Sequence, residues 1–125
     1  MEQTIIRSLL LITGSLIALT ASADNPQVVK VKVDCPFEQH CNFSVTLRHA
    51  DTGWDHYADR WEVLTPDGKV LATRTLWHPH VEEQPFTRAL SKVPVPAGLK
   101  RVMVRAHDSV HGYGTKGFEV VLPPR

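Results

Sequence analysis

The sequence predicts an all-β fold: a single antiparallel β-sandwich of about seven short strands. Three observations support this prediction. Apolar and polar residues alternate with period two through much of the chain after residue 24, as they do in strands with one buried face. Turns rich in glycine and proline separate these alternating segments. No window combines helical spacing of apolar residues with capping residues at both ends.

The N-terminal segment 1–23 is expected to be a cleaved signal peptide. It contains Arg7, an apolar run from Leu9 to Leu19 and the cleavage motif Ala21-Ser22-Ala23. The alternative is a retained membrane helix, but the apolar run is short for a span and no positive flank follows it. Residues 24–125 are then expected to form one exported domain with one modest core, in the periplasm and without membrane insertion.

The charge balance argues against a nucleic-acid partner. The formal net charge of the 125-residue chain is +1 at pH 7. A nearly neutral protein exerts no long-range attraction on nucleic acid or on an anionic membrane surface. After the first 23 residues, the sequence also contains no internal repeat and no low-complexity tract.

The first half of the domain contains four expected strands. Gln27 to Asp34 places valines on one face and lysines on the other, and Asn42 to His49 alternates more cleanly. Arg60 to Thr65 and Lys69 to Trp77 are expected to pair as a hairpin within 59–77. The turn between them contains Thr65-Pro66-Asp67-Gly68, in which proline presets the first corner and glycine tolerates positive φ.

Three further strands are expected in the second half. Phe86 to Val93 has the weakest pattern and is a candidate edge strand, followed by a proline-rich loop to Gly98. Arg101 to Ala106 alternates again, and the last strand begins at Phe118 and ends before Pro123-Pro124. We expect the glycine-rich segment 107–117 between these two strands to form a loop.

Cys35 and Cys41 are expected to form a disulfide, because an exported chain with two cysteines usually pairs them. The bond would close a small loop between the first two strands. By the loop-entropy model, it should stabilise the fold by roughly 2–3 kcal/mol. The alternatives are a thiolate metal pair or a redox couple, but five residues between the cysteines is not a redox spacing.

Trp61, on the third expected strand, resembles the buried tryptophan of immunoglobulin-like domains. The inter-sheet disulfide of antibody domains is missing, so the layout resembles a fibronectin-III-like or other immunoglobulin-like sandwich instead. In addition, segments 77–88 (WHPHVEEQPFTR) and 104–114 (VRAHDSVHGYG) resemble segments of small exported proteobacterial proteins of unassigned function. That resemblance implies an exported single domain, and it implies no activity.

The expected topology brings most histidines to one end of the sandwich. In an up-and-down arrangement of seven strands, the connections after the second, fourth and sixth strands emerge at the same end. These connections carry six of the seven histidines in pairs: His49 with His56, His78 with His80, and His107 with His111. The seventh, His40, is expected at the opposite end.

Imidazoles gathered at one end predict a transition-metal site for copper or zinc. One nitrogen from each of three loops is the preferred geometry. The expected ligands are therefore His78 or His80, then His107 and His111, and one of His49 or His56. Three carboxylates are candidate oxygen ligands, or acceptors that orient the histidines: Glu82, Glu83 and Asp108.

Two other interpretations remain open. The same end is also a candidate surface for a non-catalytic protein–protein interaction, with Trp77 and Tyr113 as aromatic anchors. Such a partner could instead bind by pairing with an edge strand. Taken singly, each histidine is explained as a structural or solvated loop residue. Catalysis is not predicted, because the chain shows no free thiol nucleophile, no triad arrangement and no phosphate-binding glycine loop.

Overall fold

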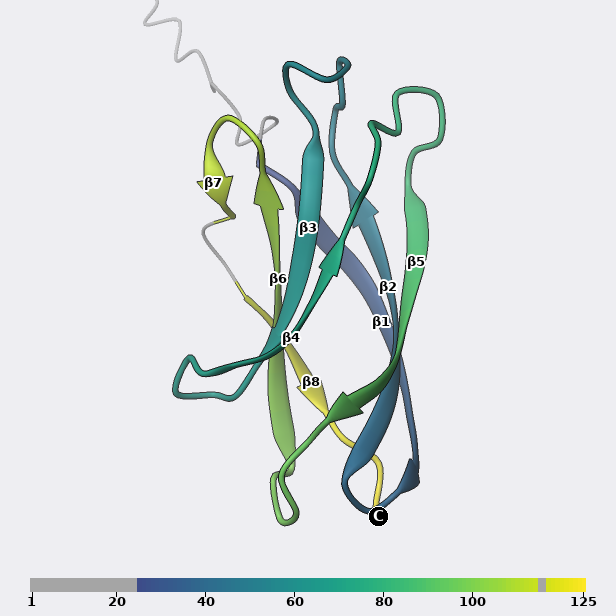
Figure 1. Ribbon diagram of the computed structural model, residues 1–125, viewed down its shortest axis with the longest axis vertical. Coiled ribbons are helices and arrows are strands. Elements are labelled where there is room, and N and C mark those ends of the chain that lie inside the picture. Colours follow the sequence, from purple (N-terminus) through teal and green to yellow (C-terminus); the bar gives the residue numbers. More distant parts are fainter. Residues whose placement is uncertain (1–24, 115–116) are drawn as a thin grey trace, which may run out of the picture.

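The computed structural model describes residues 25–114 and 117–125, which form two antiparallel β-sheets and contain no helix (Figure 1). Within these ranges, no helical segment has the length and apolarity needed to cross a membrane. The expected all-β fold with two sheets is confirmed. The expected signal peptide, residues 1–23, lies outside the described residues.

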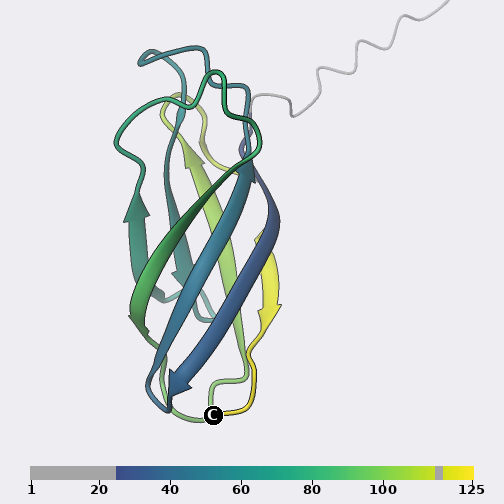
Figure 2. The same ribbon diagram turned by 90° about the vertical axis from the view of Figure 1, so that its right-hand side faces the viewer.

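The first sheet has the strand order β1-β2-β5 and faces the viewer in Figure 2. Its strands are β1 (Gln27–Phe37), β2 (His40–Arg48) and β5 (Phe86–Pro94), so the weak strand does lie at an edge. The predicted Cys35–Cys41 disulfide is present. Both cysteines lie within strands rather than between them, because β1 and β2 pair almost to the tip of their hairpin.

The second sheet is built on β3 (Ala58–Leu64) and β6 (Arg101–Asp108), with β4 (Val70–Thr75) at one edge. Two short strands, β7 (Gly112–Tyr113) and β8 (Phe118–Val121), both pair with β6. The expected hairpin of β3 and β4 is confirmed. The expectation of a loop from residue 107 was wrong, because β6 continues through Asp108 and the chain then folds back to pair as β7.

The core lies between the two sheets and is formed by the alternating residues that the sequence pattern identifies. Phe43, Val45 and Leu47 of β2 are buried against the second sheet, and Trp61 of β3 is fully buried as predicted. Burial of each large aliphatic or phenyl side chain contributes about 1.5–3 kcal/mol. A one-residue slip would turn these side chains to solvent, so the core fixes the register of the strands that end at the site.

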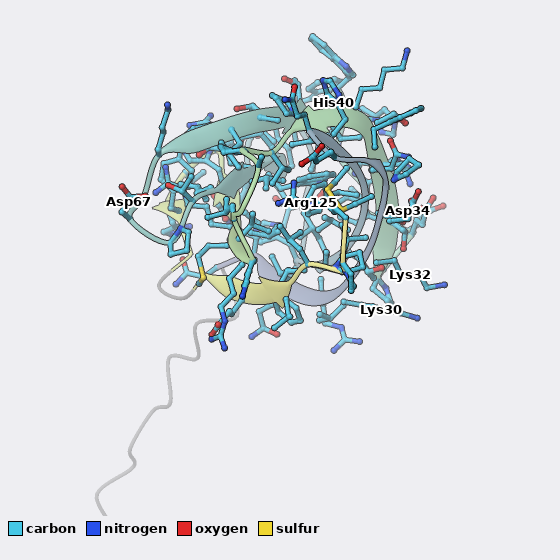
Figure 3. The ribbon with its side chains drawn as sticks, turned by 90° about the horizontal axis from the view of Figure 1, so that it is seen from below. Lys30, Lys32, Asp34, His40, Asp67 and Arg125 are labelled. Atoms are coloured by element: carbon cyan, nitrogen blue, oxygen red, sulfur yellow. A yellow bond between two sulfur atoms is a disulfide. The ribbon has the colours of Figure 1, made fainter. Side chains whose placement is uncertain are left out.

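The connections between strands sort to the two ends of the sandwich, as the topology predicts (Figures 1 and 2). One end, which we call the histidine end, comprises residues 49–57, 76–85 and 107–111. The opposite end carries His40, Asp67 and Arg125, which Figure 3 shows from below. The two ends are therefore chemically distinct, with six histidines at one and a single histidine at the other.

Candidate metal centre

The histidine end gathers three imidazoles around the carboxylate of Asp108, the last residue of β6. Asp108 is fully buried, and its Oδ2 lies 2.6 Å from Nε2 of His49 and 2.6 Å from Nε2 of His56. Nδ1 of His111 lies 3.5 Å from the same Oδ2 atom. One ligand atom each from His49, His56 and Asp108 lie within 4.8 Å of one another. A single metal ion can be held by such a group.

The two carboxylate oxygens of Asp108 have different hydrogen-bond partners. Oδ1 accepts hydrogen bonds from the backbone N–H groups of Val110, at 2.6 Å, and His111, at 3.0 Å. This is the local bonding by which aspartate builds a turn. Gly112 completes the turn with a φ of 81°, which glycine adopts without steric cost. Oδ1 therefore holds the turn in place while Oδ2 faces the imidazoles.

Asp108 is ionised in the folded protein. Burial raises the pKa of this carboxyl, but the N–H groups of Val110 and His111 and the rings of His56 and His49 lower it further, to about 2. A buried carboxylate carries a negative charge that must be compensated nearby. The centre of the histidine end is therefore suited to a cation.

A second buried carboxylate, Asp51, fixes the orientation of His49. Nδ1 of His49 is hydrogen-bonded to Oδ1 of Asp51, which leaves Nε2 directed at Asp108. Asp51 also accepts the backbone N–H of Ala58 at 3.0 Å and of His80 at 2.7 Å. Metal-binding histidines commonly have one ring nitrogen held by a carboxylate in this way, because the contact sets the tautomer and the ring orientation.

The β4–β5 connection supports this arrangement from the side. The side-chain amide of Gln84 accepts the backbone N–H of His49 and donates to the carbonyl of His80, both at 2.9 Å. His80 is buried, and its ring lies parallel to Phe86 with centroids 3.9 Å apart. Neither ring nitrogen of His80 has a hydrogen-bond partner within the described ranges. Burial lowers the pKa of His80, with Arg88 and His78 adding to the effect.

The structure groups the predicted ligands differently from the preferred geometry of one nitrogen per loop. His49, His56, His111 and Asp108 come together, whereas His78 lies over the ring of His80 with centroids 4.5 Å apart. His107 is bound to Asp59, with Nδ1 2.6 Å from Oδ1. The site is thus formed by the connections after β2 and β6. The connection after β4 supports it, because the backbone N–H of His80 donates to Asp51.

The remaining predicted side chains lie around this centre. Glu82 and Glu83 are exposed, and Glu83 accepts a hydrogen bond from Arg88 at 3.1 Å. Trp77 is 74% exposed and is therefore no part of the core. Tyr113 donates its hydroxyl proton to Glu62 at 2.5 Å. Sequence reasoning missed Asp51 and Glu62; for Asp51, the available signal was its position two residues after His49 in a loop beside a buried strand.

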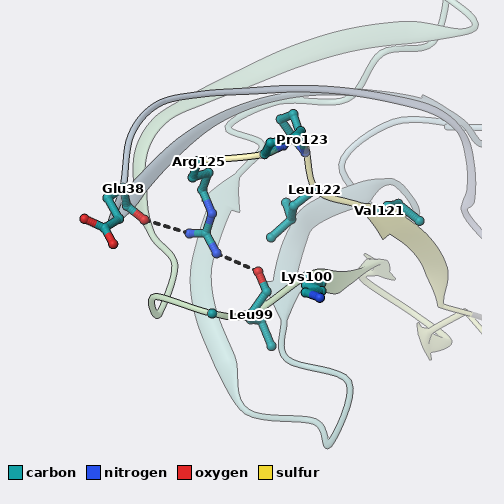
Figure 4. A pocket seen from close by; sticks show the side chains of 9 residues that line it. Glu38, Leu99, Lys100, Val121, Leu122, Pro123 and Arg125 are labelled. Carbon is teal, nitrogen blue, oxygen red and sulfur yellow. Dashed lines mark hydrogen bonds between the residues drawn. The ribbon is translucent and has the colours of Figure 1, made fainter.

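A cavity at the opposite end offers no comparable chemistry. Leu99, Val121 and Leu122 line it, and Arg125 fills one side by donating to the backbone carbonyls of Glu38 and Leu99 (Figure 4). The guanidinium group is thus occupied by main-chain acceptors. The candidate functional site is the histidine end.

Comparisons with known proteins leave the activity open. No family model matches the sequence, and no solved structure matches it. The chain is similar to a protein of the archaeon Halomicrobium mukohataei described as "Putative lipoprotein", with 44% identity over 93 residues. The match covers 74% of this chain and 45% of the relative, so the chain spans about half the length of the relative that it matches. An archaeal relative does not test the expected resemblance to proteobacterial proteins.

Proposed function

We propose that the protein binds one transition-metal ion, copper or zinc, through His49, His56 and Asp108. One observation carries the proposal: Nε2 of both histidines lies 2.6 Å from the same ionised oxygen of Asp108. His49 cannot turn away, because its other nitrogen is held by Asp51. Protons bridge these atoms at this hydrogen-bond distance, and a bound metal ion would replace those protons and separate the ligand atoms. Imidazole and carboxylate donors are ligands that Zn(II) and Cu(II) accept.

The donor set leaves room for further ligands. Two imidazoles and one carboxylate supply three of the four positions of a tetrahedral zinc site. The competing explanation is a buried network in which protons alone join the histidines to Asp108, since buried polar groups are normally hydrogen-bonded. The two explanations differ in one measurable property, which is tight binding of a metal by the purified protein.

We also propose that the protein acts in the cell envelope or the periplasm. The description of its relative as a lipoprotein, the Cys35–Cys41 disulfide and the signal-like residues 1–23 support export. The strand orders β1-β2-β5 and β4-β3-β6-β8 further support a sandwich of the immunoglobulin-like type, with β4 at the edge of the second sheet.

The 125-residue chain, expressed with residues 1–23 and purified without an affinity tag, tests the metal proposal. Calorimetric titration with Zn(II) and Cu(II) should show one tight site, and excess metal should raise the melting temperature because it binds only the folded state. His56→Gln should remove tight binding. His40→Gln, at the opposite end, is the matched control and should leave it unchanged. A wild-type protein without tight binding and without a thermal shift would refute the proposal.

A second candidate function is protein binding through the histidine end. Trp54 and Trp77 are 68% and 74% exposed in two of the connections at this end, and Val81 and Val110 of the same end are also exposed. Large exposed aromatic residues at one end of a domain favour an interaction surface. Recovery of a partner from an envelope extract by the wild type and its loss with Trp77→Ala would support this function. Equal recovery by both proteins would exclude this surface.

A further inference from the structure

The β6–β7 turn, which carries His111, returns along β6 as an arm of only two paired residues. Gly112 pairs with Asp108, and Tyr113 pairs with His107. The N–H of Gly114 also donates to the carbonyl of Ala106 at 3.1 Å, but so short a strand has few other backbone hydrogen bonds. Oδ1 of Asp108 holds the backbone of the turn at Val110 and His111, and the side-chain contacts of Tyr113 add to this by fixing the arm that follows.

Tyr113 is held by contacts to its hydroxyl and to its ring. The hydroxyl donates to Oε1 of Glu62 at 2.5 Å and accepts from Nη2 of Arg60 at 3.1 Å. The guanidinium carbon of Arg105 lies 3.8 Å from the ring centroid, and the ring of His107 meets it edge-on. Cations over an aromatic face are attracted to it. We call Glu62, Arg105 and Tyr113 the tyrosine clamp.

Glu62 gives the clamp a rigid base. Its side chain projects from β3, the residue is only 5% exposed, and Oε2 accepts two hydrogen bonds from Arg105, at 3.0 and 3.1 Å. Burial raises the pKa of Glu62, but the Tyr113 hydroxyl and Arg105 lower it further. An ionised acceptor forms the stronger kind of hydrogen bond. The clamp thus ties the arm to a central strand of the second sheet.

In the sequence, His111 lies between Asp108 of the metal centre and Tyr113 of the clamp. Its Nδ1 lies 3.5 Å from Oδ2 of Asp108, and its ring centroid lies 5.0 Å from that of His56. Its side chain is 43% exposed, whereas those of His49 and His56 are 0% and 18% exposed. His111 is therefore the imidazole on the solvent side of the group.

We infer that His111 is a fourth ligand of the metal and that Tyr113 is a positioning residue, which holds His111 in place through its hydrogen bond to Glu62. The inference rests on the proposed metal site. It assigns different roles to residues of the same turn: Asp108 binds the metal from the buried side, and His111 closes the site toward solvent. The clamp sets how closely the closing ligand approaches.

Tyr113→Phe tests the inference, because it removes the hydroxyl and retains the ring under Arg105. The affinity for Zn(II) should fall about 10-fold, as is typical when a partner that orients a ligand is lost. The electron paramagnetic resonance spectrum of the Cu(II) complex should show two nitrogen ligands instead of three. Tyr57→Phe is the matched control and should change neither value, because the Tyr57 hydroxyl has no hydrogen bond within the described part of the chain.

A double-mutant cycle separates positioning from a general loss of stability. His111→Gln should lose the same nitrogen, and Tyr113→Phe should have no further effect on affinity in that background, because coupled residues are not additive. Additive losses, or an unchanged nitrogen count in Tyr113→Phe, would overturn the inference. If Tyr113→Phe fails to fold, the His111→Gln variant tests the inference by itself. An unchanged number of nitrogen ligands in that variant would overturn the inference. A wild type that binds no metal would instead remove the proposed function.

Discussion

Nε2 of His49 lies 2.6 Å from Oδ2 of Asp108, although the two residues are 59 positions apart in the sequence. His49 follows β2 in the first sheet, and Asp108 ends β6 in the second. The contact therefore joins the two sheets at the histidine end. The core fixes the register of both strands and so the backbone positions at which they end, and the contact with Asp51 directs the ring of His49 toward Asp108.

Asp108→Asn should weaken metal binding more than the loss of an orienting partner does, by over about 100-fold. The substitution retains an oxygen that can hold the turn, but it removes the negative charge that faces the imidazoles. Calorimetric titration with Zn(II) measures the change. Asp55→Asn, an exposed residue in the β2–β3 connection, is the control. Equal affinities for Asp108→Asn and the wild type would show that Asp108 is not a ligand.

Asp51→Asn should lower the affinity for metal by about 10- to 100-fold, because Asp51 orients His49 without contacting the metal. It should also destabilise the metal-free protein by about 1.5–3 kcal/mol, since Asp51 provides charged acceptors to His49, Ala58 and His80. Urea unfolding in the presence of a chelator measures the second effect. A variant with reduced stability and wild-type affinity would contradict the orienting role.

Stability of the metal-free protein should depend on the titration of His80. Burial lowers its pKa below the ordinary value of 6.5, so between the two values the unfolded chain binds a proton that the folded chain does not. Stability must then rise with pH in this window, be complete above about pH 6.5 and decline below it. His80→Phe, which retains an aromatic ring beside Phe86, should have a shallower decline. Identical pH profiles of unfolding free energy would argue against this assignment.

The disulfide should matter for stability and not for the site. Cys35→Ser combined with Cys41→Ser should cost roughly 2–3 kcal/mol, because the bond restricts the unfolded chain. The two cysteines lie in the β1–β2 hairpin, whose tip is at the end opposite the metal centre. Zn(II) affinity at a temperature where the variant is folded should therefore equal that of the wild type. A large loss of affinity there would indicate that the two ends are coupled.

The sequence was sufficient to predict where the loops lie but not how their side chains meet. Alternation in β2 and the turn at Asp67 identified strands. Because every second connection emerges at the same end, the order of the strands then placed the histidine pairs at one end. Period-two patterns report which face a residue occupies and carry no information on ring direction. His80 was therefore a candidate ligand by position, although its ring packs on Phe86.

The contacts that sequence reasoning missed are long-range or depend on backbone detail. Asp51 acts because the β2–β3 connection folds back so that its carboxylate reaches both His49 and Ala58. β7 exists because Gly112 adopts a positive φ and lets the chain reverse on β6. Neither feature produces a periodic pattern in the sequence.

Anomalous X-ray diffraction from crystals grown with Zn(II), recorded at the zinc absorption edge, locates the bound ion itself. We expect one strong peak about 2.0–2.2 Å from Nε2 of His49, Nε2 of His56 and Oδ2 of Asp108. The absence of a peak at these three atoms, or a single peak at His78, His80 or His107 instead, would show that the metal does not bind through them.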